Sequence, residues 1–117
     1  MNNIDFDQFA DDIDGAYVFL ADRLGAALEA AEAVVEARAM VDRGRTALLN
    51  AGVDGKNEAQ REAAIRGSLA VEYGILADAE SDARRMRHQA DVAQLEVERL
   101  RLRVRLMELA ARETAAA

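Results

Sequence analysis

The chain has 117 residues and a net charge of −7 at pH 7, and it contains no Pro, Cys or Trp. Apolar residues make up 51% of it but aromatic residues only 4%. The absence of Cys excludes disulfides, thiolate nucleophiles and Cys-ligated zinc, and the absence of Pro with few Gly argues against turn-rich α/β and all-β folds. The composition therefore predicts an all-α protein built of long helices.

The first predicted helix covers residues 6–50. Asp5, with Gln8 three residues later, gives a capping-box start. Gly15 leaves open an alternative in which residues 5–14 form a separate third helix that folds back on residues 102–109. Apolar residues recur at spacings of three and four, which marks one helical face: Phe6, Phe9, Ile13, Tyr17, Leu20, Leu24, Ala27 or Leu28, Ala31, Val34, Val41 and Leu48.

Residues 51–57 have the chemistry of a helix stop followed by a helix start. Gly52 suits the left-handed position that ends a helix, and Asp54-Gly55 favours a turn. Asn57 can cap the next helix, with Gln60 completing the capping-box pattern. We predict a short connection between two helices at this point.

The second predicted helix covers residues 58–113 and carries a heptad pattern, in which Glu72 is the misfit. A short connection makes the two helices antiparallel neighbours, with residue i facing roughly residue 108 − i. That register places the acidic residues 5–14 beside the Arg residues 99–105. The heptad series reads Ile65, Leu69, Glu72, Leu76, Ala79, Ala83, Met86, Ala90, Ala93, Val97, Leu100, Val104, Met107 and Ala111.

The apolar face of the second helix widens near its end. A single long antiparallel two-helix hairpin, or coiled coil, over residues 1–117 has little interior, and a helix with two apolar stripes needs more than one neighbour. We therefore expect a homodimer that forms a four-helix bundle. The expected surface for self-association or partner binding comprises Leu100, Leu102, Val104, Leu106, Met107, Leu109, Phe6 and Phe9.

The sequence offers little evidence of a catalytic or metal-binding site. His88 lacks the Glu three residues before it that a di-metal helical bundle requires, and no triad or carboxylate pair can be recognised. The sequence predicts a protein that is not an enzyme and has no cofactor. No apolar stretch is long enough to cross a membrane, and the acidic N-terminus is unlike a secretory signal, so we expect no membrane association and a cytoplasmic location.

Two charge-based functions remain open beside a protein–protein role. An Arg series could follow a nucleic-acid backbone in a replication or recombination accessory, although the net charge and the lack of interleaved aromatic residues disfavour it. The acidic run at residues 5–14 could instead act as a DNA mimic that inhibits a DNA-binding protein. The Arg series comprises Arg84, Arg85, Arg87, Arg99, Arg101, Arg103 and Arg105.

The turn carries a family resemblance. The segment VDGKNEAQR, followed by Glu72-Tyr73 and a long helix ending LEVERLRLRVRLMELA, resembles small helical accessory proteins of tailed bacteriophages and prophages, over about residues 50–109. The resemblance implies a phage accessory factor that acts in the host cytoplasm and regulates or inhibits a host or phage protein. It also suggests a turn site, made of Asp54, Gly55, Lys56, Asn57 and Arg61.

Overall fold

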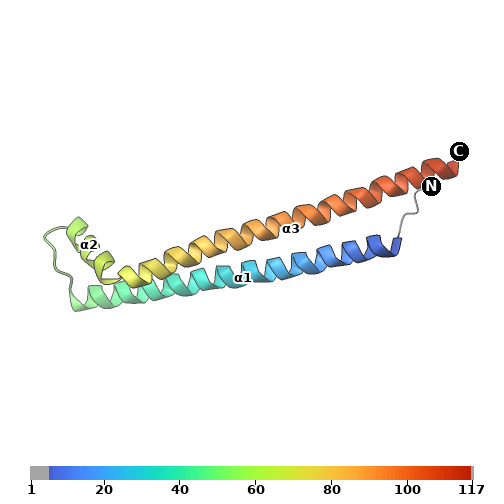
Figure 1. Cartoon of the computed structure of the whole chain (residues 1–117). Coiled ribbons are helices and arrows are strands. Elements are labelled where there is room, and N and C mark those ends of the chain that lie inside the picture. Colours follow the sequence, from blue (N-terminus) through green and yellow to red (C-terminus); the bar gives the residue numbers. More distant parts are fainter. Residues whose placement is uncertain (1–5, 117) are drawn as a thin grey trace. The chain divides into compact units, whose positions relative to one another are not determined.

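The computed structural model describes residues 6–116, and every secondary-structure element within that range is an α-helix (Figure 1). Helix α1 spans Phe6–Ala51, α2 spans Glu58–Ser68 and α3 spans Ala70–Ala116. The all-α prediction is confirmed. Helix α1 passes through Gly15 without a break, so the alternative with a separate helix over residues 5–14 is wrong. The predicted cap residue Asp5 lies outside the described residues.

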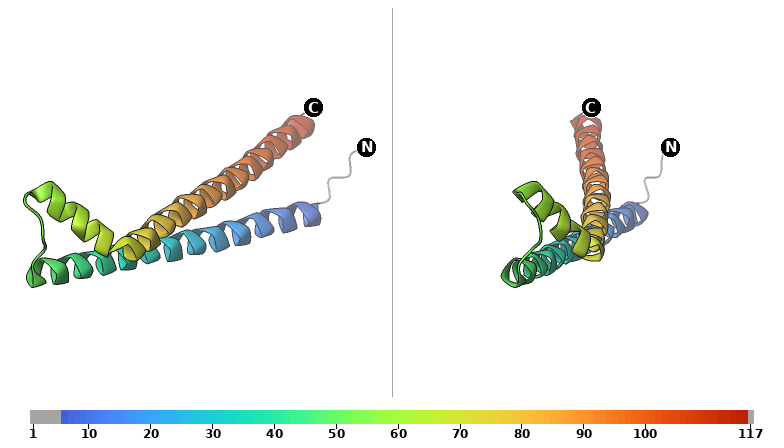
Figure 2. Two further views of the ribbon diagram at one scale, coloured as in Figure 1. Left: turned by 60° about the vertical axis from the view of Figure 1, so that its left-hand side comes forward. Right: turned by 90° about the vertical axis from the view of Figure 1, so that its left-hand side faces the viewer.

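The second predicted helix is divided in two, which corrects the expected single helix over residues 58–113. Helix α2 ends at Ser68, followed by the cap residue Leu69, whose backbone N–H donates to the Ile65 carbonyl; α3 begins at Ala70. Gly67 and Ser68, both weaker helix formers than Ala, directly precede the break. Figure 2 shows α2 set at an angle to the start of α3. The heptad pattern continues through the break, because Ile65 and Leu69 are both buried.

Contacts divide the chain into two compact units. Unit 1 comprises Met1–Ala26 and Met86–Ala117, and unit 2 comprises Ala27–Arg85. In unit 1 the start of α1 and the second half of α3 run antiparallel, because Phe9 lies by Arg103 whereas Arg23 lies by Gln89. Its core is a narrow cluster of Leu20, Ala93 and Val97, with Ala16 packed against it.

Unit 2 contains the second half of α1, all of α2 and the start of α3. The two long helices are again antiparallel, because Arg38 pairs with Glu80 and Arg45 contacts Tyr73. Leu69 packs onto α1 at Gly44, where an added Cβ would lie 2.7 Å from a Leu69 methyl carbon. A side chain at position 44 would therefore require the end of the Leu69 side chain to shift.

The predicted heptad on residues 58–113 is confirmed, with one exception. We call its α3 part within unit 1 the inner seam: Ala90, Ala93, Val97 and Leu100 are buried, and Val104 and Met107 are half-buried. Ala111, the last predicted position, is exposed. The misfit Glu72 is half-buried.

The predicted face of α1 is only partly right. Leu20, Val34 and Val41 are buried as expected, and Phe9, Ile13 and Leu48 are half-buried. Tyr17, Leu24 and Leu28 of that face are exposed, while small residues such as Ala16, Ala30 and Ala37 take the contact positions. Alanine fits the narrow space where two helices approach closely, so it displaces the larger side chains. The wrongly assigned residues are Tyr17, Leu24 and Ala31; of the alternatives Ala27 and Leu28, Ala27 is half-buried and Leu28 is exposed.

The expected register is also shifted. Arg23 hydrogen-bonds Gln89, about four residues beyond its predicted partner, and Arg38 meets Glu80, about ten residues beyond. Glu62 of α2 meets Arg45 within one residue of the expected pairing, whereas Tyr73 of α3 meets the same Arg45 ten residues beyond it, so the shift enters at the break between α2 and α3. The acidic run does lie beside the Arg residues 99–105, because Arg103 lies over the Phe9 ring. Among the described ion pairs none joins residues 7–14 to these Arg residues; Arg99 pairs with Glu96 on its own helix.

Candidate functional site

A second apolar seam runs along α3 in unit 1. It has the three-and-four spacing of a heptad, and its residues are 45–63% exposed. Arg99 occupies the one position in the series where an apolar residue is missing. We call this surface the outer seam; it comprises Val92, Leu95, Leu102, Leu106 and Leu109.

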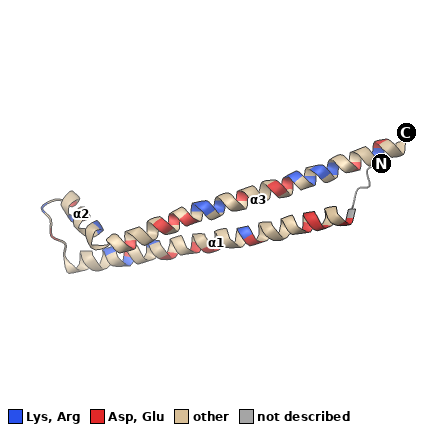
Figure 3. Ribbon diagram, viewed as in Figure 1, with Lys and Arg blue, Asp and Glu red and all other residues tan. Residues whose placement is uncertain are grey.

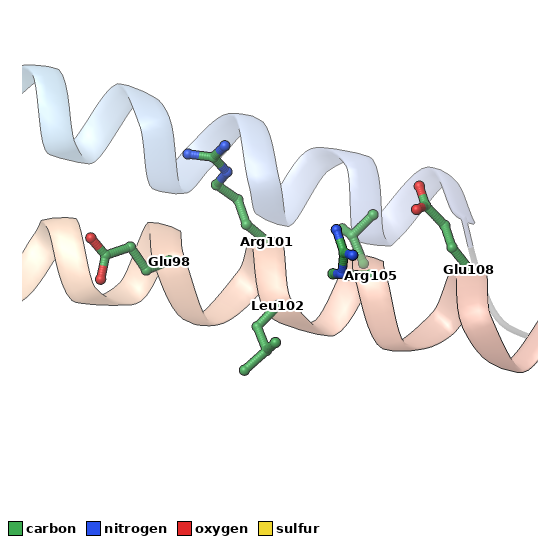
Figure 4. Close-up of a pocket in the computed structure, with 6 residues that line it drawn as sticks. Glu98, Arg101, Leu102, Arg105 and Glu108 are labelled. Carbon is green, nitrogen blue, oxygen red and sulfur yellow. The ribbon is translucent and has the colours of Figure 1, made fainter.

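The outer seam lies on the opposite side of α3 from the inner seam. Leu95 is two residues from Ala93 and from Val97, and Leu102 is two residues from Leu100 and from Val104. Two residues turn an α-helix by about 200°, so each outer side chain points away from its inner neighbours. Figure 4 shows Leu102 directed away from α1. Helix α3 thus has two apolar faces, of which α1 covers one.

The charges beside the outer seam change sign along the helix. Its flanking positions carry Asp91, Glu96 and Glu98 in the first half, and Arg103, Arg105 and Arg112 in the second half. Figure 3 shows acidic and basic bands along α3. The surface therefore has an acidic end and a basic end around a centre near residues 100 and 101.

Local contacts hold several of these charges in place. Arg99 donates from Nε and Nη2 to the two Glu96 carboxylate oxygens at 2.9 and 2.6 Å, which lowers the pKa of Glu96 and raises that of Arg99. The Arg103 guanidinium lies 5.6 Å from the centre of the Phe9 ring. Glu98, Leu102 and Arg105 line a shallow pocket of about 410 Å³ on the same helix (Figure 4).

The structure divides the predicted interaction surface into two sets. Leu102, Leu106 and Leu109 are exposed on the outer seam, whereas Leu100, Val104, Met107 and Phe9 take part in the contact between α1 and α3. The side chain of Phe6 lies outside what the structure describes. Val92 and Leu95 were missed, although they continue the Leu102–Leu106–Leu109 spacing toward the start of α3.

Beside Phe9, unit 1 has an open apolar groove of about 710 Å³. Val104 and Met107 line it together with Ala111 near the end of α3. The groove is formed where the start of α1 meets the last turns of α3. Phe9 thus belongs to this groove and not to the outer seam.

The predicted turn site has structural roles for most of its residues. Asn57 caps α2, since its side chain accepts from the Gln60 backbone N–H at 2.9 Å, and Gln60 in turn accepts from the Lys56 backbone N–H. Arg61 donates to the Gly55 carbonyl at 3.4 Å. Gly52 has φ +90°, the left-handed conformation predicted for a helix end.

Gly55 has a steric role in the same turn. An added Cβ would lie 2.8 Å from the Arg61 backbone nitrogen. The turn is therefore built around the start of α2, and the contact of Arg61 with Gly55 accounts for a residue that helix capping alone does not explain. Asp54 is exposed, as is the Lys56 side chain.

Sequence reasoning missed a polar cluster that links all three helices in unit 2. Arg45 of α1 binds both Glu62 oxygens, at 2.7 and 2.9 Å, and donates to the Tyr73 hydroxyl at 2.9 Å. Arg66 lies over the Tyr73 ring at 4.8 Å and pairs with Glu62. The Arg45 hydrogen bond lowers the pKa of Glu62, and the Glu62 and Tyr73 hydrogen bonds raise that of Arg45.

This cluster acts as a clamp on α2. A bidentate Arg–carboxylate pair combines two charge-assisted hydrogen bonds with a fixed geometry. No local pattern indicates the cluster, because its members lie 17 and 28 residues apart along the chain.

The Arg series is interrupted by acidic partners. Arg85 pairs with Asp82 and Arg99 with Glu96, both on α3 itself, while Arg103 lies over Phe9. Arg84, Arg87, Arg101 and Arg105 are exposed. Three residues of the Arg series, Arg85, Arg99 and Arg103, therefore already contact other side chains of this protein.

Three comparisons, with protein-family models, with curated proteins and with solved structures, each gave no match for this chain. Over residues 6–116 no group of three or more His, Asp or Glu side chains is arranged to hold a metal ion. None of the helices described combines the length and the apolar character that crossing a membrane requires.

Proposed function

We propose that this chain is a non-enzymatic helical interaction protein, and that the outer seam of α3 is its binding surface. The observation that supports the proposal most is five large apolar residues at heptad spacing, each 45–63% exposed on one face. Burying one Leu or Val side chain contributes roughly 1.5–3 kcal/mol, so a helix that covered this face would gain several such terms. Regular spacing over the length of the seam favours a helical partner.

The polar cluster of unit 2 is also consistent with a binding role, because its residues contact one another. Arg45, Glu62 and Tyr73, which are joined by three hydrogen bonds, satisfy one another and hold α2 in place. The resemblance of residues 53–61 to phage accessory proteins supports a regulatory or inhibitory action on a host or phage protein in the bacterial cytoplasm. That part of the proposal depends on the turn segment alone.

The proposal is tested by placing charge in the outer seam. The double variant Leu102→Glu/Leu106→Glu is compared with the wild type and with Val35→Glu/Leu49→Glu, which changes exposed apolar residues of α1 outside the seam. Mass in solution is measured by light scattering, and capture of bacterial proteins on the immobilised chain is measured in parallel.

We expect that self-association or capture is lost in the seam variant and kept in the control. Circular dichroism checks that both variants remain helical. If neither self-association nor capture depends on Leu102 and Leu106, the outer seam is not a binding surface and the proposal is overturned.

A further inference from the structure

We infer that the outer seam of α3 binds a second copy of this chain, in an antiparallel orientation about a two-fold axis near residues 100 and 101. The inference rests on the proposed function, which makes the outer seam a binding surface, and it names the occupant. Apolar spacing alone does not choose between partners. The charges beside the seam identify the partner, because the acidic end of one copy is complementary to the basic end of a second copy that runs in the opposite direction.

The apolar layers define the register. In an antiparallel coiled coil, the core positions of one helix face those of the other in reverse order. Val92 then faces Leu109 of the second copy, and Leu95 faces Leu106 of the second copy. At the centre Arg99 faces Leu102 of the second copy, and its guanidinium can remain at the edge of the seam beside Glu96, where it already is.

The flanking charges agree with this register at every pair. Glu98 meets Arg105 of the other copy and Asp91 meets Arg112. Glu96 meets Arg103 of the other copy when the Arg103 side chain turns from the Phe9 ring toward the outer seam. Two-fold symmetry repeats each pair, so the interface contains three kinds of ion pair, each twice. Exposed pairs contribute little affinity singly, but together they specify orientation and register.

A parallel dimer is disfavoured by the same residues. Parallel helices in register would place Arg99 against Arg99 of the second copy in the core of the interface. They would also bring Asp91 next to Glu96 of the second copy, two like charges, and would leave Arg105 and Arg112 without acidic partners, so that only Glu98 and Arg103 would attract one another. Like-charge pairs at these positions destabilise a coiled coil and select against that arrangement.

Antiparallel registers shifted by one heptad are disfavoured by the apolar layers. A shift in one direction places Leu95 against Glu113 of the second copy, and a shift in the other places Leu109 against Arg85. In the proposed register, by contrast, every large apolar residue of the outer seam faces another such residue or the aliphatic part of Arg99. One register therefore satisfies both the apolar and the charge patterns.

The expected dimer has a distinct order of helices in unit 1. Because the outer seam lies opposite α1, the two α3 helices meet at the centre, with an α1 on the far side of each. The dimer then contains four helices in a row within this unit. That order replaces the closed four-helix bundle which the sequence predicts.

Single cysteines test the orientation, because the chain has no native cysteine. Val92→Cys and Leu109→Cys are made in separate full-length chains and oxidised alone and as a mixture. We expect a disulfide-linked dimer chiefly from the mixture. Val18→Cys, on an α1 residue that is 70% exposed, is the control and is expected to cross-link weakly in every combination.

Charge variants test the same arrangement independently. Glu96→Arg/Glu98→Arg should raise the dimer dissociation constant on the order of tenfold, since four attractive pairs become repulsive. Adding Arg103→Glu/Arg105→Glu to that chain should restore the wild-type constant. Light scattering and sedimentation measure both.

The outcomes separate the inference from the proposed function. Efficient cross-linking of Val92→Cys with itself would show a parallel dimer, which overturns the inference and leaves the outer seam as a binding surface. A monomer at every concentration also overturns the inference. In that case the proposed function stands only if Leu102→Glu/Leu106→Glu abolishes capture of another protein.

Discussion

The two units are held together differently: unit 2 joins three helices through a polar clamp, although residues such as Val35 and Val71 are exposed there, whereas unit 1 leaves the heptad-spaced outer seam uncovered. In unit 2 a third helix, α2, packs beside the long helices, and the Arg45–Glu62–Tyr73 clamp joins all three. In unit 1 only α1 and α3 pair, over a thin core that includes Ala16 of α1 and Ala93 of α3. We infer from this difference that unit 2 stabilises the fold around the turn and that the outer seam of unit 1 is the surface that binds a partner.

The largest expected effect is in the thin core of unit 1. Val97 is 2% exposed, and Val97→Asp would bury a carboxylate without a partner. We expect a large loss of helicity and of the thermal transition by circular dichroism, because few other contacts hold this unit together. Val18→Asp, on a residue 70% exposed, is the control and should leave the transition almost unchanged. Equal behaviour of the two variants would contradict the assignment of the inner seam.

The next effect concerns the break between α2 and α3. Leu69 is 7% exposed and packs on Gly44, so Leu69→Ala should destabilise unit 2 by about 2–5 kcal/mol. Chemical denaturation measures the change. Leu49→Ala, at a residue 58% exposed, is the control and should cost much less. A small effect at Leu69 would mean that the break is not held against α1.

A smaller effect is expected in the turn. Gly55→Ala places a Cβ 2.8 Å from the Arg61 backbone nitrogen, so it should destabilise by more than about 1 kcal/mol. Gly67→Ala is the matched comparison, because its added Cβ meets open space in α2, and it should stabilise by roughly 0.5–1 kcal/mol. Denaturation midpoints of the two variants should move in opposite directions; the same direction for both would contradict the packing of Arg61 on Gly55.

The smallest effect is the pH dependence of the clamp. Arg45 lowers the pKa of Glu62 in the folded chain below its unfolded value of about 4.3. The stabilisation is therefore complete above that pH and is lost as the pH falls through the lower folded pKa. Glu62→Gln should destabilise the chain near neutral pH and much less in strong acid. Glu29→Gln, on an exposed residue of α1, is the control and should lack this dependence.

The sequence predicts the buried face of a helix best where the apolar residues fit only one face. Heptad residues 65–107 are predicted correctly because the large residues at both ends of the series, such as Ile65 and Leu69 or Val97 and Leu100, fix one face, and the Ala positions between them follow from the spacing. On α1 the pattern was ambiguous, since Ala occurs on every face and the contact uses Ala16, Ala30 and Ala37 in place of Leu24 and Leu28. Residue type could not reveal which face approaches α3 closely, because that choice depends on both helices.

The break at Leu69 and the clamp were missed for a different reason. The heptad runs through Leu69 without interruption, so periodicity cannot locate a bend there. Arg45, Glu62 and Tyr73 lie far apart in the chain, and only the tertiary structure brings them together. The sequence predicts Leu102, Leu106 and Leu109 of the outer seam. Its start at Val92 and Leu95, and the change in sign of its flanking charges, become recognisable only when the structure shows which face of α3 the inner seam occupies.

The most direct test of the central claim is the distance between the two copies at His88, an exposed residue that lies just before the outer seam. A spin label is attached to His88→Cys in the full-length chain, and the label-to-label distance is measured by pulsed electron resonance. An antiparallel dimer in the proposed register separates the two labelled positions by about 37 Å along the helices. A distance near the roughly 8–10 Å spacing of neighbouring helices would mean a parallel dimer, and the absence of any dipolar signal would mean a monomer; either result would contradict the account.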